Sequence, residues 1–302
     1  KDDGDAWDIK PKDYFNRRSS KALLVSSECF TEGPTAYALQ NYRIGESTIS
    51  QKVMIYEGSK KIEFITKVEW KETKRMLRTS FPVNIKSDIA KYNIQFGHIE
   101  RPATHENKID KARYETSGHK WVDLSEKDYG VALLNNCKYG YRIWDNVLDM
   151  NLLRSPMYPG IDADKGIHEF TYVLYPHIGD LEHSDTYLEA YRLNVPLWIV
   201  KQETSVHDSL LPPEQSLIQI DSKQVIIENI KKSEDDQGYI LRLYNSGSEI
   251  SRANISFQHF KPESIVDLME NKLEQCESET NLNYSFKPFE ILSVKLLAAS
   301  QA

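Results

Sequence analysis

Between residues 96 and 107 a regular strand pattern gives way to a loop that is dense in polar and ionisable side chains. Loops at strand ends often carry function. His98 and Glu100 could act as a general acid and base, and together with His105 they could supply metal ligands. Alternate residues of a strand share a face, so hydrogen bonding of His98 and Glu100 to Arg101 or to backbone groups is the simpler interpretation.

A second group contains His119, Asp123 and Ser125, residue types that form nucleophilic triads. No Gly-x-Ser-x-Gly turn surrounds Ser125, and these three residue types often occur close together by chance. We therefore reject a triad at this position.

Arg154 closes an apolar stretch and is followed by Ser155 and Pro156, so it lies where a strand ends. Its guanidinium presents donors in a fixed fork, which suits paired sugar hydroxyls or a carboxylate. A structural salt bridge is an equal alternative from the residue type alone.

The elements that position these residues are mainly strands. Alternation with a period of two is the strongest signal, and between residues 61 and 70 apolar side chains take one face and Lys or Glu the other. The turn at residues 57–59 predicts a hairpin between two of the strands. Strands are predicted at residues 48–56, 61–70, 91–96, 129–134, 148–153, 170–175, 225–230, 239–244 and 291–296.

One short helix is predicted from Asp180 to Leu193, before Pro196 prevents its continuation. A proline-containing break between residues 207 and 216 predicts a domain boundary, and the acidic residues 233–238 predict a hairpin tip. The expected fold is all-β, with a large antiparallel β-sandwich over residues 1–207 and a smaller one over 216–302.

Composition excludes several classes of function. A chain of 302 residues with 40% hydrophobic residues can bury a substantial core, but no stretch approaches the roughly 20 apolar residues of a membrane helix. A net charge of −7, with scattered Lys and Arg, offers no basic stripe for phosphates. We expect neither nucleic acid nor a membrane as a partner.

The three cysteines, Cys29, Cys137 and Cys276, are far apart and odd in number. This pattern argues against a disulfide framework and predicts ordinary thiols in a reducing cytoplasm. The chain starts without Met in a charged segment, Lys1 to Asp5, and we expect it to be cut from a longer polypeptide.

Separated blocks of the sequence resemble glycoside hydrolase family 38 α-mannosidases, in the cytosolic or bacterial branch. The order and spacing of the blocks match as well. The blocks are Asp5–Asp8, Phe96–Pro102, His119–Glu126, Leu133–Gly140, Leu152–Pro156, His168–Tyr172 with Pro176–His177, and Pro288–Leu292.

The resemblance implies a retaining exo-α-mannosidase that removes terminal mannose, with a large sandwich of the galactose-mutarotase-like supersandwich type. Two His and two Asp of an N-terminal catalytic barrel would hold a zinc ion there, and an Asp would be the nucleophile. This chain has no matching zinc motif. We therefore expect no catalytic and no metal-binding residues here, zinc bound outside the chain, and no activity of the chain alone.

The resemblance also implies partners and contacts. The partners are the N-terminal catalytic domain of the same polypeptide and a mannose-containing oligosaccharide, and a homodimer is left open. Trp7 is expected to stack on the sugar or close the pocket, and Arg154 to hydrogen-bond its hydroxyls. One departure is Ala103, which separates Pro102 from Thr104 where the family commonly reads Arg-Pro-Thr-His. The expected substrate-binding residues are Trp7, Asp5, Arg154, Arg101 and His98.

Two other functions stay open from the sequence. A sugar epimerase or mutarotase would need acid and base residues to converge in an open cleft. Its candidate residues are His98, Glu100, His168 and Glu169. A carbohydrate-binding module would instead need several coplanar, exposed rings, for which Trp144 and Tyr158 are candidates.

Overall fold

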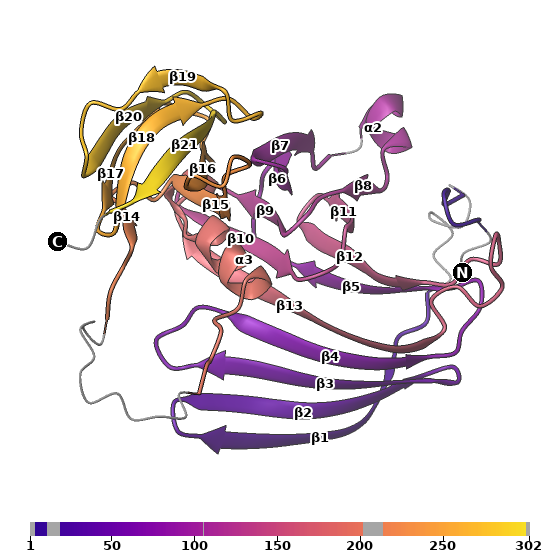
Figure 1. Ribbon diagram of the computed structural model, residues 1–302. Helices are drawn as coiled ribbons and strands as arrows, with labels where there is room; N and C mark the ends of the chain where they lie inside the picture. Colours follow the sequence, from indigo (N-terminus) through magenta and orange to yellow (C-terminus); the bar gives the residue numbers. More distant parts are fainter. Residues whose placement is uncertain (1–3, 11–18, 105, 202–213, 300–302) are drawn as a thin grey trace. The chain divides into compact units, whose positions relative to one another are not determined.

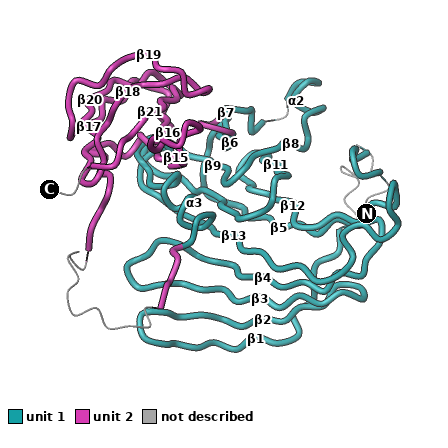
Figure 2. The backbone as a smooth tube through the Cα atoms, in the orientation of Figure 1, with its two compact units in different colours: residues 1–94, 99–196 teal, residues 95–98, 197–302 magenta. Residues whose placement is uncertain are grey.

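The structure, a computed structural model, describes residues 4–10, 19–104, 106–201 and 214–299 (Figure 1). The chain divides into two compact units, residues 1–94 with 99–196 and residues 95–98 with 197–302 (Figure 2). Strands dominate the regular structure, which confirms the all-β class. The predicted domain ranges stay a prediction, because residues 202–213 lie outside the described part of the chain.

The larger sheet of unit 1 contains nine strands within the described residues, in the order β1-β2-β3-β4-β13-β10-β9-β6-β7 (Figure 1). On β4, Val68 and Trp70 are buried, while the lysine and glutamate that alternate with them are exposed. β3 pairs antiparallel with β4, which confirms the predicted hairpin. The strands are β1 Leu23–Glu32, β2 Thr35–Ile44, β3 Ser47–Tyr56, β4 Ile62–Trp70, β6 Ile89–Ile94, β7 Gly97–Pro102, β9 Trp121–Ser125, β10 Tyr129–Asn135 and β13 Gly166–Ile178.

A four-stranded sheet, counted over the described residues, shares its core with this larger sheet. The ring of Tyr92 on β6 lies edge-on to that of Tyr141 on β11, with centroids 6.2 Å apart. Each large apolar side chain buried between the sheets contributes about 1.5–3 kcal/mol. The strands, in sheet order, are β5 Met76–Pro82, β12 Val147–Arg154, β11 Gly140–Trp144 and β8 Thr116–Ser117.

A buried carboxylate connects three strands of this smaller sheet. Asp149 on β12 is 2% exposed and accepts hydrogen bonds from Arg78 Nε and Ser80 Oγ on β5, each at 2.5 Å. Arg142 Nη2 on β11 donates at 3.0 Å to Oδ2, the oxygen that also accepts from Ser80. Arg78 also donates to Glu115 at 3.0 Å. These donors replace the water that the carboxylate loses on burial, so the strand pairing and the charge network depend on each other.

The turn after β10 is organised by Asn135, whose side chain is buried. Its Nδ2 donates to the His119 carbonyl oxygen at 3.0 Å and to the Tyr141 hydroxyl. Its Oδ1 accepts from the backbone N–H groups of Cys137, at 2.9 Å, and Lys138. One side chain thus satisfies backbone groups of two different loops and fixes the core residue Tyr141.

Replacing Asn135 by Ala should lower the free energy of unfolding by about 2–4 kcal/mol, because several buried donors and acceptors lose their partner. Urea unfolding followed by near-ultraviolet circular dichroism measures the change. The neighbouring exposed Asn136, which accepts from the Thr171 N–H, is the matched control, and Asn136→Ala should cost less than about 1 kcal/mol. Equal losses in the two variants would contradict the assigned role.

The predicted helix between residues 180 and 193 consists of two elements, a 3₁₀-helix at Leu181–His183 and α3 at Thr186–Asn194. Asp180 begins the first by accepting a hydrogen bond from the His183 N–H at 3.2 Å. Tyr187 of α3 packs edge-on against Trp121 of β9, with ring centroids 5.0 Å apart. The helix therefore covers the face of the larger sheet that the four-stranded sheet leaves open.

A second short helix, α2 at Lys108–Ala112, was not found from the sequence. Five residues are too few for a helical period to emerge. Its start is marked by Asn107, whose Oδ1 accepts from the N–H groups of Ile109 and Asp110 at 2.9 Å each. No helix in the described ranges is long and apolar enough to span a membrane.

The strand predicted at residues 91–96 differs from the structure in two ways. β6 ends at Ile94, and Phe96 lies in the turn with a φ of +57°. Asn93, which alternation assigned to the polar face, is 3% exposed because its Oδ1 accepts the Lys120 N–H at 3.1 Å. The hydrogen bond to this backbone N–H offsets the free energy that the amide loses when burial removes its water.

Unit 2 is a smaller sandwich, with a three-stranded sheet (β14-β17-β20) and a five-stranded sheet (β15-β16-β21-β18-β19) over its described residues. The predicted hairpin tip joins β15 to β16. There Asp235 accepts from Ser233 Oγ at 2.7 Å and Lys295 Nζ at 2.5 Å, which holds the pKa of this carboxyl below its usual value. The strands are β14 Ile218–Ile220, β15 Val225–Lys232, β16 Tyr239–Asn245, β17 Ser251–Phe257, β18 Phe260–Val266, β19 Lys272–Gln275, β20 Asn281–Phe286 and β21 Ile291–Ala298.

Candidate functional site

The segment that carries Trp7 is shaped by Asp5. The Asp5 carboxylate accepts hydrogen bonds from the N–H groups of Trp7 and Asp8, each at 2.9 Å. Ala6, which lies between Asp5 and Trp7, donates its N–H to the Tyr158 carbonyl oxygen at 2.9 Å. This Asx-type turn satisfies the local backbone and leaves the indole of Trp7 73% exposed. Asp5 thus acts on the placement of Trp7.

An exposed pair of rings results. The rings of Trp7 and Tyr158 lie edge to face, with centroids 5.7 Å apart and planes at 61°. Tyr158 is itself 63% exposed. Amphipathic rings of this kind offer an apolar face together with a polar tip. Because the two planes are not coplanar, they do not form the flat platform that a carbohydrate-binding module would need.

Arg154 reaches the same segment from the end of β12. Its Nη1 donates to the Ala6 carbonyl oxygen at 3.2 Å, and its Nη2 donates to that of Asp8. Its own N–H donates to Asp164 Oδ2 at 2.9 Å. The guanidinium fork therefore clamps the backbone on both sides of Trp7, so Arg154 is a positioning residue in this structure.

Tyr114 holds the far end of the segment, because its hydroxyl donates to the Ile9 carbonyl oxygen. Burial raises the pKa of this phenol, and the negative charges of Asp8 and Glu115 raise it further. The hydroxyl consequently keeps its proton and remains a donor at neutral pH. The sequence gave no reason to choose Tyr114, since its contact joins residues more than a hundred positions apart.

Arg101 does not take part in this cluster. Its guanidinium lies over the Tyr92 ring, 4.6 Å from the centroid, and Nη1 donates to the Ser117 carbonyl oxygen at 2.8 Å. It lines a small pocket in unit 1 that Tyr114 also lines. The structure thus brings Asp5, Trp7 and Arg154 together and places Arg101 in a neighbouring pocket.

His98 and Glu100 do not form an acid and base pair. His98 is 9% exposed and belongs to unit 2, where its ring lies edge-on to Phe289 with centroids 5.1 Å apart. Glu100 is exposed and pairs with Lys91 at 3.8 Å. His105, the third candidate metal ligand, lies outside the described residues.

The residues proposed for a mutarotase do not converge either. His168 and Glu169 are adjacent on β13, so their side chains point to opposite faces of the sheet. His168 Nε2 contacts the Asp164 carbonyl oxygen at 2.8 Å, and Glu169 pairs with Lys67 at 2.7 Å. Each has a local partner, and no shared cleft joins them.

A buried pair replaces the rejected triad. Asp123 accepts a hydrogen bond from Ser125 Oγ at 2.7 Å, and His177 Nε2 lies 2.7 Å from its other oxygen. His119 lies apart, with its ring edge-on to Tyr139. The serine hydroxyl therefore points to a carboxylate rather than to a histidine, and His119, Asp123 and Ser125 are not arranged as a triad.

Metal ligands are not grouped in the part of the chain that the structure describes. No set of three or more His, Cys, Asp or Glu side chains there is arranged to hold a metal ion. The residues present in the described ranges therefore do not fit the zinc site that the resemblance implies for the family.

Comparison with known proteins identifies the family of this chain. The description "Glycosyl hydrolases family 38 C-terminal domain" matches residues 1–162, which is more than half of the chain. The chain belongs to glycoside hydrolase family 38. A second description, "Glycosyl hydrolases family 38 C-terminal beta sandwich domain", matches residues 224–294. The family resemblance seen in the motif blocks is thus confirmed, and both matches assign the chain to the C-terminal region.

Relatives from family 38 are much longer than this chain. "Alpha-mannosidase 2C1" of Mus musculus is 35% identical over 98% of the chain but only 29% of its own length. "Alpha-mannosidase G" of Dictyostelium discoideum is 33% identical over 94% of the chain and 26% of its own length. The chain therefore spans less than a third of these relatives.

A solved structure shows the same fold. The crystal structure of an α-mannosidase from Enterococcus faecalis V583 superposes with a TM-score of 0.78 at 15% identity, over 91% of this chain and 35% of that chain. At this identity the likeness concerns the fold, and it agrees with two sandwiches in succession in a family 38 C-terminal region.

Arg154→Ala should loosen the Trp7 segment without unfolding unit 1. We expect hydrogen exchange of the amides of residues 6–8 to accelerate about tenfold, since one or two charge-assisted bonds to their backbone are lost. Mass-spectrometric exchange measures this. Arg43→Ala is the matched control, because exposed Arg43 also donates to a backbone oxygen, that of Gly45. Unchanged exchange in the first variant would contradict the clamp.

Asp123→Ala should destabilise unit 1 by about 3–5 kcal/mol, because it leaves buried His177 without its partner. The control is another Asp–His pair, Asp180 with His183, at the same 2.7 Å but largely exposed. Asp180→Ala should cost less than about 2 kcal/mol, including its helix-capping bond. Urea unfolding compares the two, and similar costs would show that burial does not set the strength of the first pair.

Proposed function

We propose that this chain is the C-terminal β-sandwich portion of a retaining exo-α-mannosidase that hydrolyses terminal α-mannosyl residues. In this proposal it supports the catalytic barrel and completes the substrate cleft. The observation that carries the second part is the exposed Trp7, held by Asp5, Arg154 and Tyr114. The printed names of the relatives, which are α-mannosidases, support the first part.

The proposed division of labour leaves bond cleavage to the N-terminal catalytic domain of the same polypeptide. A retaining mechanism needs two carboxyl groups about 5–5.5 Å apart on either side of the bond. Zinc, bound outside this chain, would hold sugar hydroxyls when present. The contribution of this chain is to hold the Trp7 ring at a fixed place, where its apolar face can cover the C–H face of a mannose.

Restriction of Trp7 before the sugar arrives is what makes this contribution useful. An indole on an unrestrained segment would lose conformational entropy when a mannose binds, and that loss would weaken binding. Here Asp5 and Arg154 already fix the backbone on both sides of the ring. The ring can therefore contribute to substrate positioning with little further ordering.

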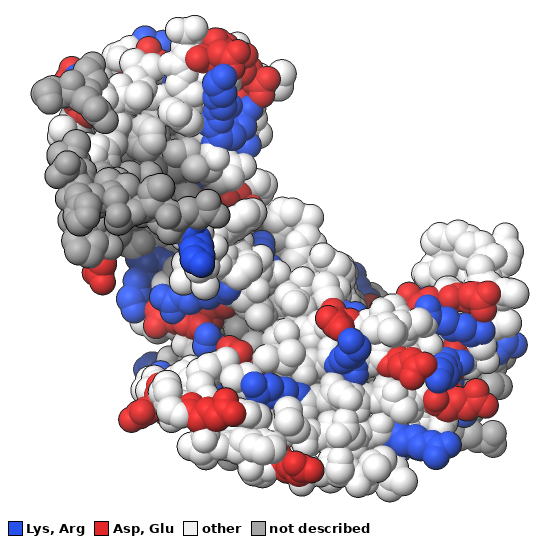
Figure 3. Space-filling view, turned by 60° about the horizontal axis from the view of Figure 1, so that its bottom comes forward, with Lys and Arg blue, Asp and Glu red and all other residues white. Residues whose placement is uncertain are grey.

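A cytoplasmic role in the metabolism of mannose-containing oligosaccharides is part of the proposal. Cys29, Cys137 and Cys276 are free thiols, two of them exposed, which suits a reducing compartment. Lys and Arg side chains are interspersed with Asp and Glu on the face in view in Figure 3, as on an ordinary solvated surface. The homodimer left open by the sequence stays a prediction.

The division of labour is tested by hydrolysis of an aryl α-mannoside with added zinc. The 302-residue chain is compared with the same chain extended N-terminally through the catalytic region. We expect turnover by the extended polypeptide alone. Turnover by the shorter chain would overturn the proposal, because a catalytic pair would then have to lie within it.

The role of Trp7 is tested in the extended polypeptide. Trp7→Ala should lower kcat/KM by about tenfold to a hundredfold, since roughly 1.4–2.8 kcal/mol of substrate positioning is lost. Arg154→Ala should lower it in the same direction, because it frees the same segment. Trp198→Ala is the matched control, as Trp198 is 91% exposed and lies in unit 2. Unchanged kcat and KM in Arg154→Ala would refute the assignment of Arg154.

A further inference from the structure

Two arginines in unit 1 have no acidic partner among the residues that the structure describes. Arg101 on β7 and Arg113, which follows α2, both line the small pocket next to Tyr114. Within the described ranges, no carboxylate forms an ion pair with either guanidinium. The nearby Arg142 differs, because its charge is matched by Asp149 at 3.0 Å. The pocket therefore has a local excess of positive charge.

The two unmatched charges affect each other. Partial burial lowers the pKa of Arg101, the nearby Tyr92 opposes this effect, and the charge of Arg113 lowers the pKa further. A guanidinium gives up water on burial and recovers that free energy only through a counter-charge or hydrogen bonds. For Arg101 the structure supplies the face of Tyr92 and the Ser117 carbonyl oxygen, which leaves most of its donors unused.

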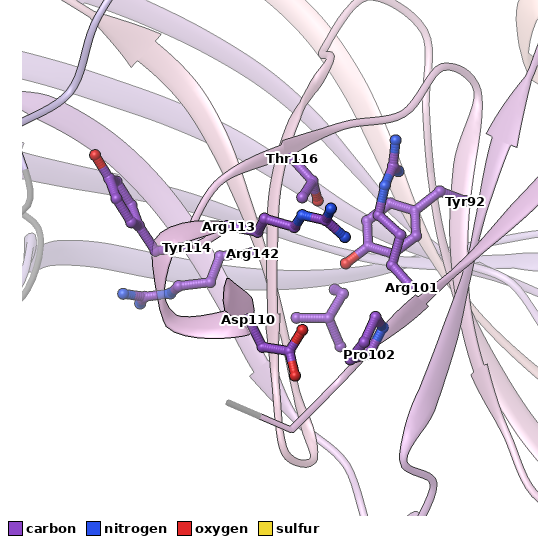
Figure 4. Close-up of a pocket in the computed structure, with 9 residues that line it drawn as sticks. Tyr92, Arg101, Pro102, Asp110, Arg113, Tyr114, Thr116 and Arg142 are labelled. Atoms are coloured by element: carbon purple, nitrogen blue, oxygen red, sulfur yellow. The ribbon is translucent and has the colours of Figure 1, made fainter. Parts of the chain in front are cut away.

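The geometry directs both groups to one place. In Figure 4, the Arg113 guanidinium extends toward Thr116 and the stacked pair of Arg101 and Tyr92, whereas Arg142 points away. Asp110 is the single acidic residue in the pocket lining drawn from the described chain, and its carboxylate accepts a hydrogen bond from Asn107 Nδ2.

The size of the cavity limits what can enter. Its volume of about 20 Å³ admits one water-sized group. A sugar ring does not fit, but a single oxygen of a carboxylate or phosphate does, with the rest of the ligand outside. Two forked guanidiniums around one such oxygen supply the charge-assisted donors that oxyanions bind most strongly.

We propose that Arg101 and Arg113 form a binding site for an oxyanion, a phosphate monoester or a carboxylate carried by a larger ligand. The bound anion offsets the positive charge of both guanidiniums and weakens their mutual repulsion. The Tyr92 ring stacks against the guanidinium of Arg101, and Thr116 lines the pocket. This site is independent of whether Trp7 contacts mannose.

The experiment titrates the N-terminally extended polypeptide with inorganic phosphate, methyl phosphate and acetate by calorimetry at constant ionic strength. We expect saturable binding at one site. Arg113→Gln should weaken it at least tenfold, because one of the two counter-charges is lost. Arg101→Gln should weaken it similarly, but only Arg113→Gln leaves the Tyr92 stack and the Ser117 bond intact. Arg252→Gln, at an exposed position of β17 in unit 2, should leave binding unchanged.

The outcomes separate the sources of the oxyanion. Binding of methyl phosphate with little binding of acetate assigns the site to phosphate esters, and the reverse order assigns it to carboxylates. No saturable binding of any of the three anions would overturn the proposal. Binding that Arg113→Gln leaves unchanged, with thermal unfolding showing that the variant is folded, would overturn it as well.

Discussion

The desolvation of one carboxylate constrains much of unit 1. Asp149 is buried between β5 and β11 and is tolerated because Arg78, Ser80 and Arg142 replace its water. These donors reach it only when the three strands keep their register, in which Asp149 lies directly opposite Ser80 and Arg142. The same register points the neighbouring residues of β12 into the shared core and carries the strand to Arg154, which holds the Trp7 segment. The network also balances the charge of Arg142 with that of Asp149. Within the described ranges, Arg101 and Arg113 are then the arginines around their pocket that have no acidic partner.

Nine of the strands that the structure describes could be predicted from local sequence patterns, whereas others, such as β1 and β2, were not predicted. β4 lies where the period-two pattern predicted it, since burial of one face imposes that pattern on the sequence. β10 also lies where it was predicted, although its residues after Tyr129 are buried on both faces. Alternation failed where a distant backbone group decided the outcome. Asn93 is buried because the Lys120 N–H needs its oxygen, and no window around residue 93 contains that information. α2 was not predicted, because a helix of five residues is too short to show a helical period in the sequence.

The sequence anticipated only some of the residues in this cluster and none of its internal geometry: Arg101 and His98 lie outside it, and Tyr114 was not expected. Resemblance selected Asp5, Trp7 and Arg154, and the structure brings these three together. Their roles depend on contacts across more than a hundred residues, such as those from Tyr158 and Tyr114, which no spacing rule reveals. For Arg154 the resemblance suggested contact with sugar hydroxyls, whereas the structure shows it bound to the backbone around Trp7. Residue type alone could not distinguish these two uses of the same fork of donors.

The clamp on the Trp7 segment acts almost entirely through main-chain atoms. Arg154 binds the carbonyl oxygens of Ala6 and Asp8, Tyr114 binds that of Ile9, and the Ala6 N–H binds Tyr158. None of these bonds uses the side chain at position 7. Natural variation could therefore exchange the residue there for another without disturbing how the segment is held, and the ligand preference of the surrounding surface could diverge through one codon while the scaffold stays the same.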